Sequence, residues 1–86
     1  MPRVILAGSI RQHAGGSGSI DVAAATVREA ITALEAAHPS LKGWVVDEQG
    51  VLRRHVKLFH RGIAVVLEQK LEPEDELHIV GAISGG

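Results

Sequence analysis

The residues best placed to do chemistry are the last six of the chain, and none of them has a reactive side chain. They are Gly81, Ala82, Ile83, Ser84, Gly85 and Gly86. The group left to react is the main-chain carboxylate of Gly86, which is ionised at neutral pH because its pKa is about 3.3–3.7. A carboxylate is a poor electrophile. It must therefore be activated, most simply as an acyl-adenylate made by a partner that uses ATP, before it can accept sulfur or an amine.

A partner must also choose this carboxylate over those of the ten Asp and Glu side chains. Glycine has no Cβ, so a tail that ends in Gly85-Gly86 can thread a narrow channel and adopt backbone angles closed to other residues. Fully extended, residues 81–86 reach about 20 Å. Ordering such a tail costs entropy, so the globular part must add docking contacts. We expect a globular domain in residues 1–80 and a flexible tail in 81–86.

Other side-chain groups give no sign of a self-contained catalyst. His55 and His60 lie five residues apart, so a regular strand places them on opposite faces, and the chain has no cysteine. The glycine-rich residues 15–18 lack the lysine and the following helix of a phosphate-binding loop. We therefore expect no metal site, no bound cofactor and no enzyme activity in this chain.

Size and charge narrow the class of protein further. The 86 residues suit one domain, and nine Lys and Arg against ten Asp and Glu leave a formal charge of −1. That balance argues against nucleic-acid binding, which favours a basic face. The apolar start is too short for a signal peptide, and no apolar stretch approaches the roughly 20 residues of a membrane span. We expect a cytoplasmic protein.

The elements that must position the tail begin with one helix. Thr26 can cap it, and Glu29 three residues later completes a capping box. Residues at helical spacing then form one apolar stripe. These are Val27, Ala30, Ile31, Leu34 and Ala37. Pro39 ends the helix, because the residue before a proline is driven from helical angles.

The remaining segments have the patterns of strands and turns. A glycine-rich turn at 13–18 suggests a hairpin, and the break at Gly8-Ser9 suggests a bulge or a frayed strand end. Residues 47–50 and the acidic residues 72–75 have the composition of two further turns. The strand-like stretches are 4–7, 19–22, 44–46 with 51–52, 55–59, 63–67 and 76–80. One helix suffices to cover one face of a small sheet, so the fold class is α+β.

Alternation in residues 55–59 predicts a docking surface. If Val56 and Leu58 face the helix, Phe59 lies on the opposite face with Lys57 and Arg61. An exposed aromatic ring beside cations suits partner binding. Trp44, in contrast, is expected to pack in the core or against the end of the helix.

Several stretches together resemble a known family over nearly the whole chain. They are the arginine-containing segment 9–16, the Thr-Val helix start at 26–34, residues 38–41 after the helix, the acidic turn and strand at 71–79, and the small-residue run 82–86. This pattern is similar to the ubiquitin-like β-grasp sulfur carriers, typified by the small subunit of molybdopterin synthase and the sulfur carrier of thiamine biosynthesis. The resemblance implies a mixed sheet of about four to five strands on one main helix, with the first and last strands parallel and central.

The resemblance also implies partners. An E1-like adenylating enzyme would activate Gly86, a cysteine desulfurase or rhodanese-type protein would supply sulfur, and a downstream synthase would receive it from the thiocarboxylate. Tail residues Gly81 to Gly85 would contact these partners. The chain would then be a protein co-substrate, or the small subunit of a sulfurtransferase such as molybdopterin synthase. Molybdopterin, thiamine, cysteine and tRNA thiolation all stay open as pathways.

The chain departs from the family at three places. His60-Arg61-Gly62 stands where the family commonly has Asn-Gly, Glu74-Asp75 where it has Gly-Asp, and Gly81 where it often has proline. These departures bear on which partner is used. Two other functions stay open: a ubiquitin-like modifier joined through Gly86 to lysines, and a non-catalytic β-grasp interaction module.

Overall fold

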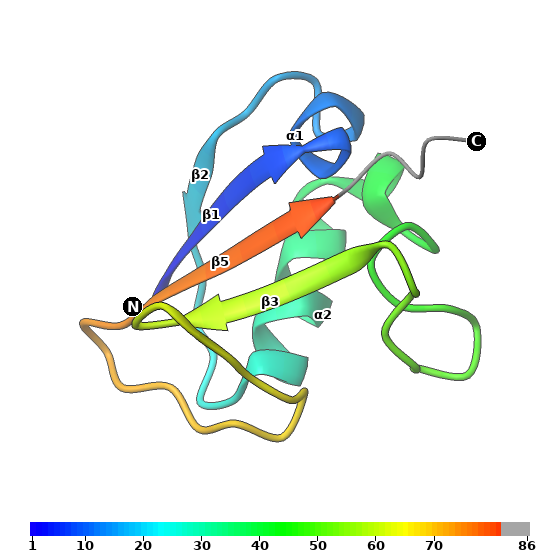
Figure 1. The fold of residues 1–86 in the computed structure, drawn as a ribbon. Helices are drawn as coiled ribbons and strands as arrows, with labels where there is room; N and C mark the ends of the chain where they lie inside the picture. The colour runs from blue at the N-terminus through cyan, green and yellow to red at the C-terminus, as the bar shows by residue number, and fades with distance from the viewer. Residues whose placement is uncertain (82–86) are drawn as a thin grey trace.

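The computed structural model describes residues 1–81 as a mixed five-stranded sheet with one main helix against one face (Figure 1). The strand order is β2-β1-β5-β3-β4. In chain order the elements are β1 (Arg3–Gly8), α1 (Ser9–His13), β2 (Ser19–Asp21), α2 (Val27–Ala37), the 3₁₀ helix η1 (Pro39–Leu41), β3 (Val56–His60), β4 (Ile63–Ala64) and β5 (Glu76–Gly81). The α+β prediction is confirmed.

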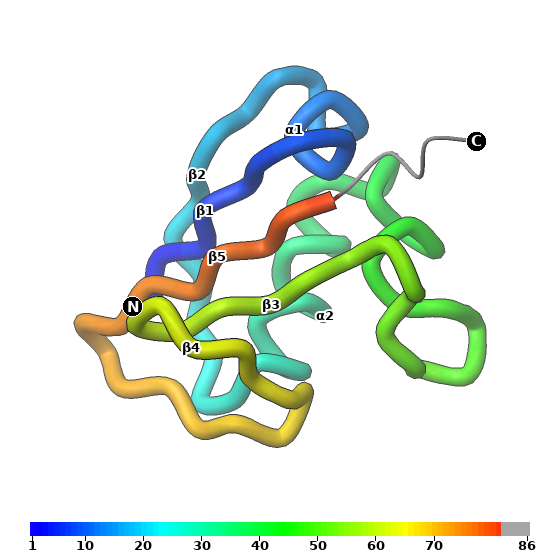
Figure 2. The backbone as a smooth tube through the Cα atoms, viewed as in Figure 1, coloured from blue at the N-terminus to red at the C-terminus, as the bar shows by residue number. Residues whose placement is uncertain are grey.

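The first and last strands form the middle of the sheet, as the resemblance implied. β1 runs parallel to β5, with Val4 opposite Leu77 and Leu6 opposite Ile79. All four side chains are buried, at most 2% exposed, on the face that α2 covers. β2 and β3 pair antiparallel to the outer sides of this central pair. The short β4 then edges the sheet beyond β3 (Figure 2).

Helix α2 begins with the predicted cap. Oγ1 of Thr26 accepts a hydrogen bond from the Glu29 N–H at 3.2 Å, and Oε1 of Glu29 accepts one from the Ala25 N–H at 2.9 Å. The predicted stripe is buried apart from its last member, Ala37, which lies exposed in the final turn. The helix ends at Ala37, and Pro39 opens η1 two residues later.

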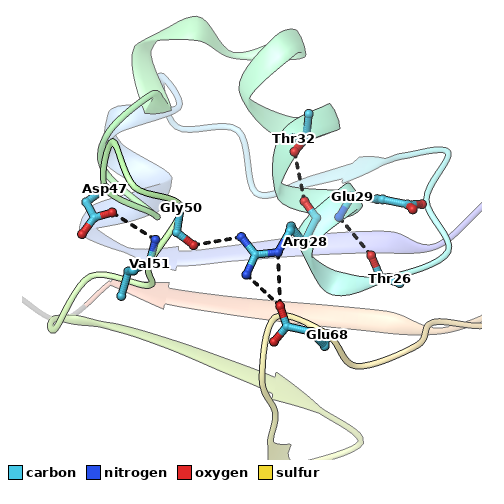
Figure 3. A network of polar contacts seen from close by, with 8 residues as sticks. All are labelled: Thr26, Arg28, Glu29, Thr32, Asp47, Gly50, Val51 and Glu68. Carbon is cyan, nitrogen blue, oxygen red and sulfur yellow. Dashed lines mark hydrogen bonds and ion pairs between the residues drawn. The ribbon is translucent and has the colours of Figure 1, made fainter.

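Arg28 of α2 ties two long loops to the helix (Figure 3). Its Nε and Nη2 donate to Oε2 of Glu68 at 3.2 and 2.7 Å, while Nη1 donates to the carbonyl of Gly50 at 2.9 Å. The turn at 47–50 is confirmed, because Oδ1 of Asp47 accepts from the Val51 N–H at 3.0 Å. One guanidinium thus holds both loops in place.

Two local expectations were wrong, and a third held only in part. The break at Gly8-Ser9 is neither a bulge nor a frayed end, because β1 runs to Gly8 and α1 follows at once, inside the β1–β2 connection. Residues 44–46 and 51–52 form no strands but a single bridge between Val46 and Leu52. The apolar run 63–67 gives only the two-residue β4, with Ile63 68% exposed. β4 pairs only with Phe59 and His60, at the end of the five-residue β3, and one further hydrogen bond runs from the Val65 N–H to the carbonyl of Leu58.

Candidate functional site

The site begins where β5 ends. Gly81, which we expected to open the tail, is the last residue of β5 and is buried, paired with Gly8 on one side and Val56 on the other. A Cβ on Gly81 would collide with Oγ of Ser9 and would lie 2.6 Å from Cγ1 and 2.9 Å from the amide nitrogen of Ile10. The start of α1 therefore packs directly on Gly81, which fixes the point where the tail leaves the sheet.

The tail residues lie beyond this point. Our expectations for them fall outside the described residues and stay predictions. They concern Ala82, Ile83, Ser84, Gly85 and Gly86.

The face of the sheet opposite α2 carries the predicted docking residues. Val56 and Leu58 are buried at 4% and 2% exposure, so Lys57 and Phe59 point to the other face, as expected. Phe59 is half-buried between its cross-strand neighbours His78 and Ala64. None of the described residues forms a helix over this face (Figure 1). Phe59 lies on this face next to the edge strand β4, with His78 of the central strand beside it.

Arg61 has a different environment from the other two docking candidates. It lies in the turn after β3, with φ 54°, and its Nη2 donates to Oδ1 of Asp75 at 3.2 Å. Asp75 is buried, and its Oδ2 lies 3.0 Å from Nε2 of His60 and accepts the Glu72 N–H at 2.7 Å. This last hydrogen bond, with the His60 and Arg61 contacts, lowers the pKa of Asp75 from 3.8 to about 2. These contacts of Asp75 hold the turn between β3 and β4 against the turn that precedes β5.

Trp44 corrects the sequence analysis, which placed it in the core or at the helix end. Its side chain is 44% exposed, while the next residue, Val45, fills the buried position. The indole stacks on the imidazole of His13, with ring centroids 3.8 Å apart, and the Arg53 guanidinium carbon lies 5.4 Å from the indole centroid. We call His13, Trp44 and Arg53 the tail-end stack. The sequence signals only a tryptophan and an arginine in one loop segment, where Arg53 donates to the carbonyls of Gly43 and Val45. The stacking of His13 on Trp44 depends on α1, whose last residue is His13.

Among residues 1–81, no cluster of three or more His, Cys, Asp or Glu side chains could hold a metal ion. Within the same range, none of the helices combines the length and apolar character that crossing a membrane requires.

The parallel β1–β5 pair, its antiparallel flanks and the single covering helix define the ubiquitin-like β-grasp class. Comparisons with known proteins agree. The chain is 37% identical over 62 residues to small archaeal modifier protein 1 of Haloferax volcanii, covering 72% of this chain and 71% of that protein. No family model matches the sequence.

Solved structures extend the likeness to the whole chain. The crystal structure of SAMP1 from Haloferax volcanii matches with a TM-score of 0.88 at 32% identity, over 99% of this chain and 98% of that one. A chain of the BexX/CysO complex of Amycolatopsis orientalis matches with a TM-score of 0.85 at 30% identity, over 100% of both chains. The protein therefore belongs to the ubiquitin-like β-grasp family of small sulfur carriers and protein modifiers. Small ubiquitin-like carriers and modifiers of this kind are themselves not enzymes.

Proposed function

We propose that this protein is a sulfur carrier whose Gly86 carboxylate is adenylated by an E1-like enzyme and converted to a thiocarboxylate. The proposal rests on one observation: a buried strand end is followed by residues that have no reactive side chain. Gly81 is buried at the end of the central strand, and the sequence continues as small residues to Gly85-Gly86. Membership of the carrier and modifier family supports the same interpretation.

The chemistry needs three steps. The Gly86 carboxylate attacks ATP in the activating enzyme, which forms an acyl-adenylate and releases pyrophosphate. A persulfide on the sulfur donor, a cysteine desulfurase or rhodanese-type protein, attacks the acyl carbon and AMP leaves. A thiol then cleaves the resulting acyl disulfide reductively and leaves the thiocarboxylate. This chain supplies only the carboxyl carbon and has no cysteine that could hold sulfur itself.

Docking contacts must supplement the tail, because a segment of only five residues, 82–86, offers little surface. We assign part of this contact to the open sheet face around Phe59 and Lys57. Arg61 contributes less, because its guanidinium already binds Asp75. The existence of a BexX/CysO complex for a relative at 30% identity supports a partner enzyme of the activating or sulfur-transfer kind. A downstream synthase, such as that of the molybdopterin, thiamine or cysteine pathways or of tRNA thiolation, would receive the sulfur.

Intact-mass measurement of protein from its native source tests the proposal directly. We expect a fraction in which one terminal oxygen is replaced by sulfur. Deleting Gly86 should abolish thiocarboxylate formation, yet change the free energy of unfolding by no more than about 0.5 kcal/mol. A wild-type terminus that stays unmodified with ATP, sulfur donor and the activating enzyme would instead indicate an inert interaction module.

A second function shares the activation step. The relative in Haloferax volcanii is a modifier protein by name, which favours conjugation of Gly86 to lysines of other proteins. Proteolysed extracts would then contain lysines that carry a Gly-Gly remnant, and these remnants would disappear on deletion of Gly86. Their absence, together with a thiocarboxylate, would leave the carrier function alone.

A further inference from the structure

The charges of the molecule are divided between its two ends. Most of the ten acidic residues lie at the end where β5 begins. These are Asp21, Glu29, Glu68, Glu72, Glu74, Asp75 and Glu76. The opposite end, where β5 finishes, is built from α1, η1 and residues 42–55. Segments 9–18, 38–46 and 53–60 contain no Asp or Glu, and the acids at this end are Glu35, Asp47 and Glu48.

Cations gather at this second end without internal partners. Arg11, Lys42, Arg53 and Arg54 are all exposed, and none lies within 4 Å of a carboxylate of residues 1–81. Arg11 and Arg53 donate instead to the backbone carbonyls of Gly16 and Gly43, at 3.0 and 2.7 Å. These neutral contacts hold the two arginine side chains in place, whereas Lys42 lies near the carboxylate of Glu35 and Arg53 lines one hollow with Asp47 and Glu48. Of the nearby acids, Asp47 is bound by the amides of its own loop.

The tail-end stack lies at the same end and includes Arg53, one of these cations. Oγ of Ser40 donates to the carbonyl of His13 at 2.5 Å, which joins η1 to α1 beneath the stacked rings. Trp44 is therefore a pre-ordered aromatic side chain that stays 44% exposed. Trp and Arg are the residue types that dominate binding energy at protein interfaces, and ordering them in advance lowers the entropy lost on binding.

Because the tail is short, any enzyme that binds Gly86 must lie close to this end of the molecule. Residues 82–86 span at most about 17 Å, so the active site that takes Gly86 lies within that distance of Gly81. α1 packs on Gly81, and His13 is the last residue of α1. An enzyme that encloses the tail therefore comes close to the tail-end stack.

We propose that the tail-end stack, with Arg11 and Lys42 beside it, docks on an acidic surface of the activating enzyme that also holds a recess for the Trp44 indole. This inference rests on the proposed function and adds a second contact to the open sheet face. Opposite charge speeds encounter and orients the carrier with its tail toward the active site. The Trp44 indole, once bound in the recess, then slows dissociation of the carrier from the enzyme.

The test is ATP–pyrophosphate exchange by the activating enzyme from the same genome, with the full-length carrier as the varied substrate. Trp44→Ala should raise the KM for the carrier about tenfold, with kcat changed less than about twofold, whereas Trp44→Phe should keep most of the affinity. Lys42→Glu should raise KM about fivefold at low salt, and the difference should shrink at about 0.5 M salt. Lys70→Glu, the same change at the acidic end, is the matched control and should leave KM unchanged.

Thermal unfolding of each variant confirms that it is folded before KM is compared. Wild-type KM values for folded Trp44→Ala and Lys42→Glu, together with a raised KM for Phe59→Ala, would overturn the inference and leave docking to the sheet face. Equal effects of Lys42→Glu and Lys70→Glu would also overturn it, because only net charge would then matter. A wild-type carrier that the enzyme does not activate would refute the proposed function itself, and this inference with it.

Discussion

Replacing Gly81 with alanine probes the packing that fixes the tail exit. The added methyl group would meet Oγ of Ser9, which can rotate away, and also Cγ1 and the amide nitrogen of Ile10, at 2.6 and 2.9 Å. The Ile10 side chain is 2% exposed and its nitrogen belongs to the α1 backbone, so neither can move freely. Relief to an ordinary contact requires α1 to shift by about half an ångström or more.

The expected cost follows from that overlap. Overpacking a tight site costs about 1–3 kcal/mol, and the lower chain entropy of alanine in the unfolded state returns about 0.4–1 kcal/mol. We expect Gly81→Ala to lower the free energy of unfolding by about 1–2 kcal/mol. For a domain of this size, that corresponds to a drop in Tm of about 5–15 °C.

Urea and thermal unfolding followed by circular dichroism measure the effect. Gly18→Ala is the matched control, because a Cβ there would meet only the flexible guanidinium of Arg11, at 3.3 Å and beyond. We expect this control to stay within about 0.5 kcal/mol of the wild type. If Gly81→Ala is as stable as Gly18→Ala, α1 does not pack on the end of β5 and the tail exit is not fixed as argued.

Two further predictions concern the helix cap and the buried acid. Thr26→Ala should destabilise the protein by about 1 kcal/mol through loss of the cap. Thr32→Ala in the same helix should be neutral or stabilising by up to about 0.5 kcal/mol. Urea unfolding measures both variants, and equal losses of stability would contradict the role of the cap. Asp75→Asn should lower Tm near pH 6. Because the pKa of Asp75 is lowered to about 2 in the folded state, its stabilisation is complete above the ordinary pKa of 3.8 and is lost as the pH falls toward 2. The gap in Tm between wild type and variant should therefore narrow from pH 5 to pH 2, while Glu74→Gln, an exposed neighbour, should show no such gap.

The sequence predicted those elements whose pattern is long or carries its own stop signals. α2 has a full capping box, a stripe of apolar residues and a terminating Pro39, so local chemistry alone defines its limits. β1 follows from an apolar run and β5 from alternation that turns Leu77 and Ile79 inward, and both strands lie in the middle of the sheet. Helix α1 was missed because it has five residues and no side-chain cap, and burial of Ile10 against the sheet is what stabilises it.

In the candidate site, too, some features were predictable from the sequence and others were not. Alternation along β3 correctly placed Lys57 and Phe59 on the open face. The role of Asp75 could not be predicted from an acidic turn, since it depends on His60 and Arg61 arriving from another strand connection. Trp44 was misplaced because apolar character does not decide which of two neighbouring residues is buried, and Val45 fills that position.

Charged side chains contribute to stability at one end of the molecule and to partner recognition at the other. At the end where β5 begins, carboxylates are paired within the fold, Asp21 with Arg3, Glu68 with Arg28 and Asp75 with Arg61. Their removal should change Tm and leave docking to the tail end untouched. At the end where β5 finishes, Arg11 and Arg53 donate to backbone carbonyls, and no carboxylate of residues 1–81 forms a close ion pair with a cation of this end, so salt should weaken binding there while changing folding little. A partner that must receive the tail therefore meets cations that form no close ion pair within residues 1–81.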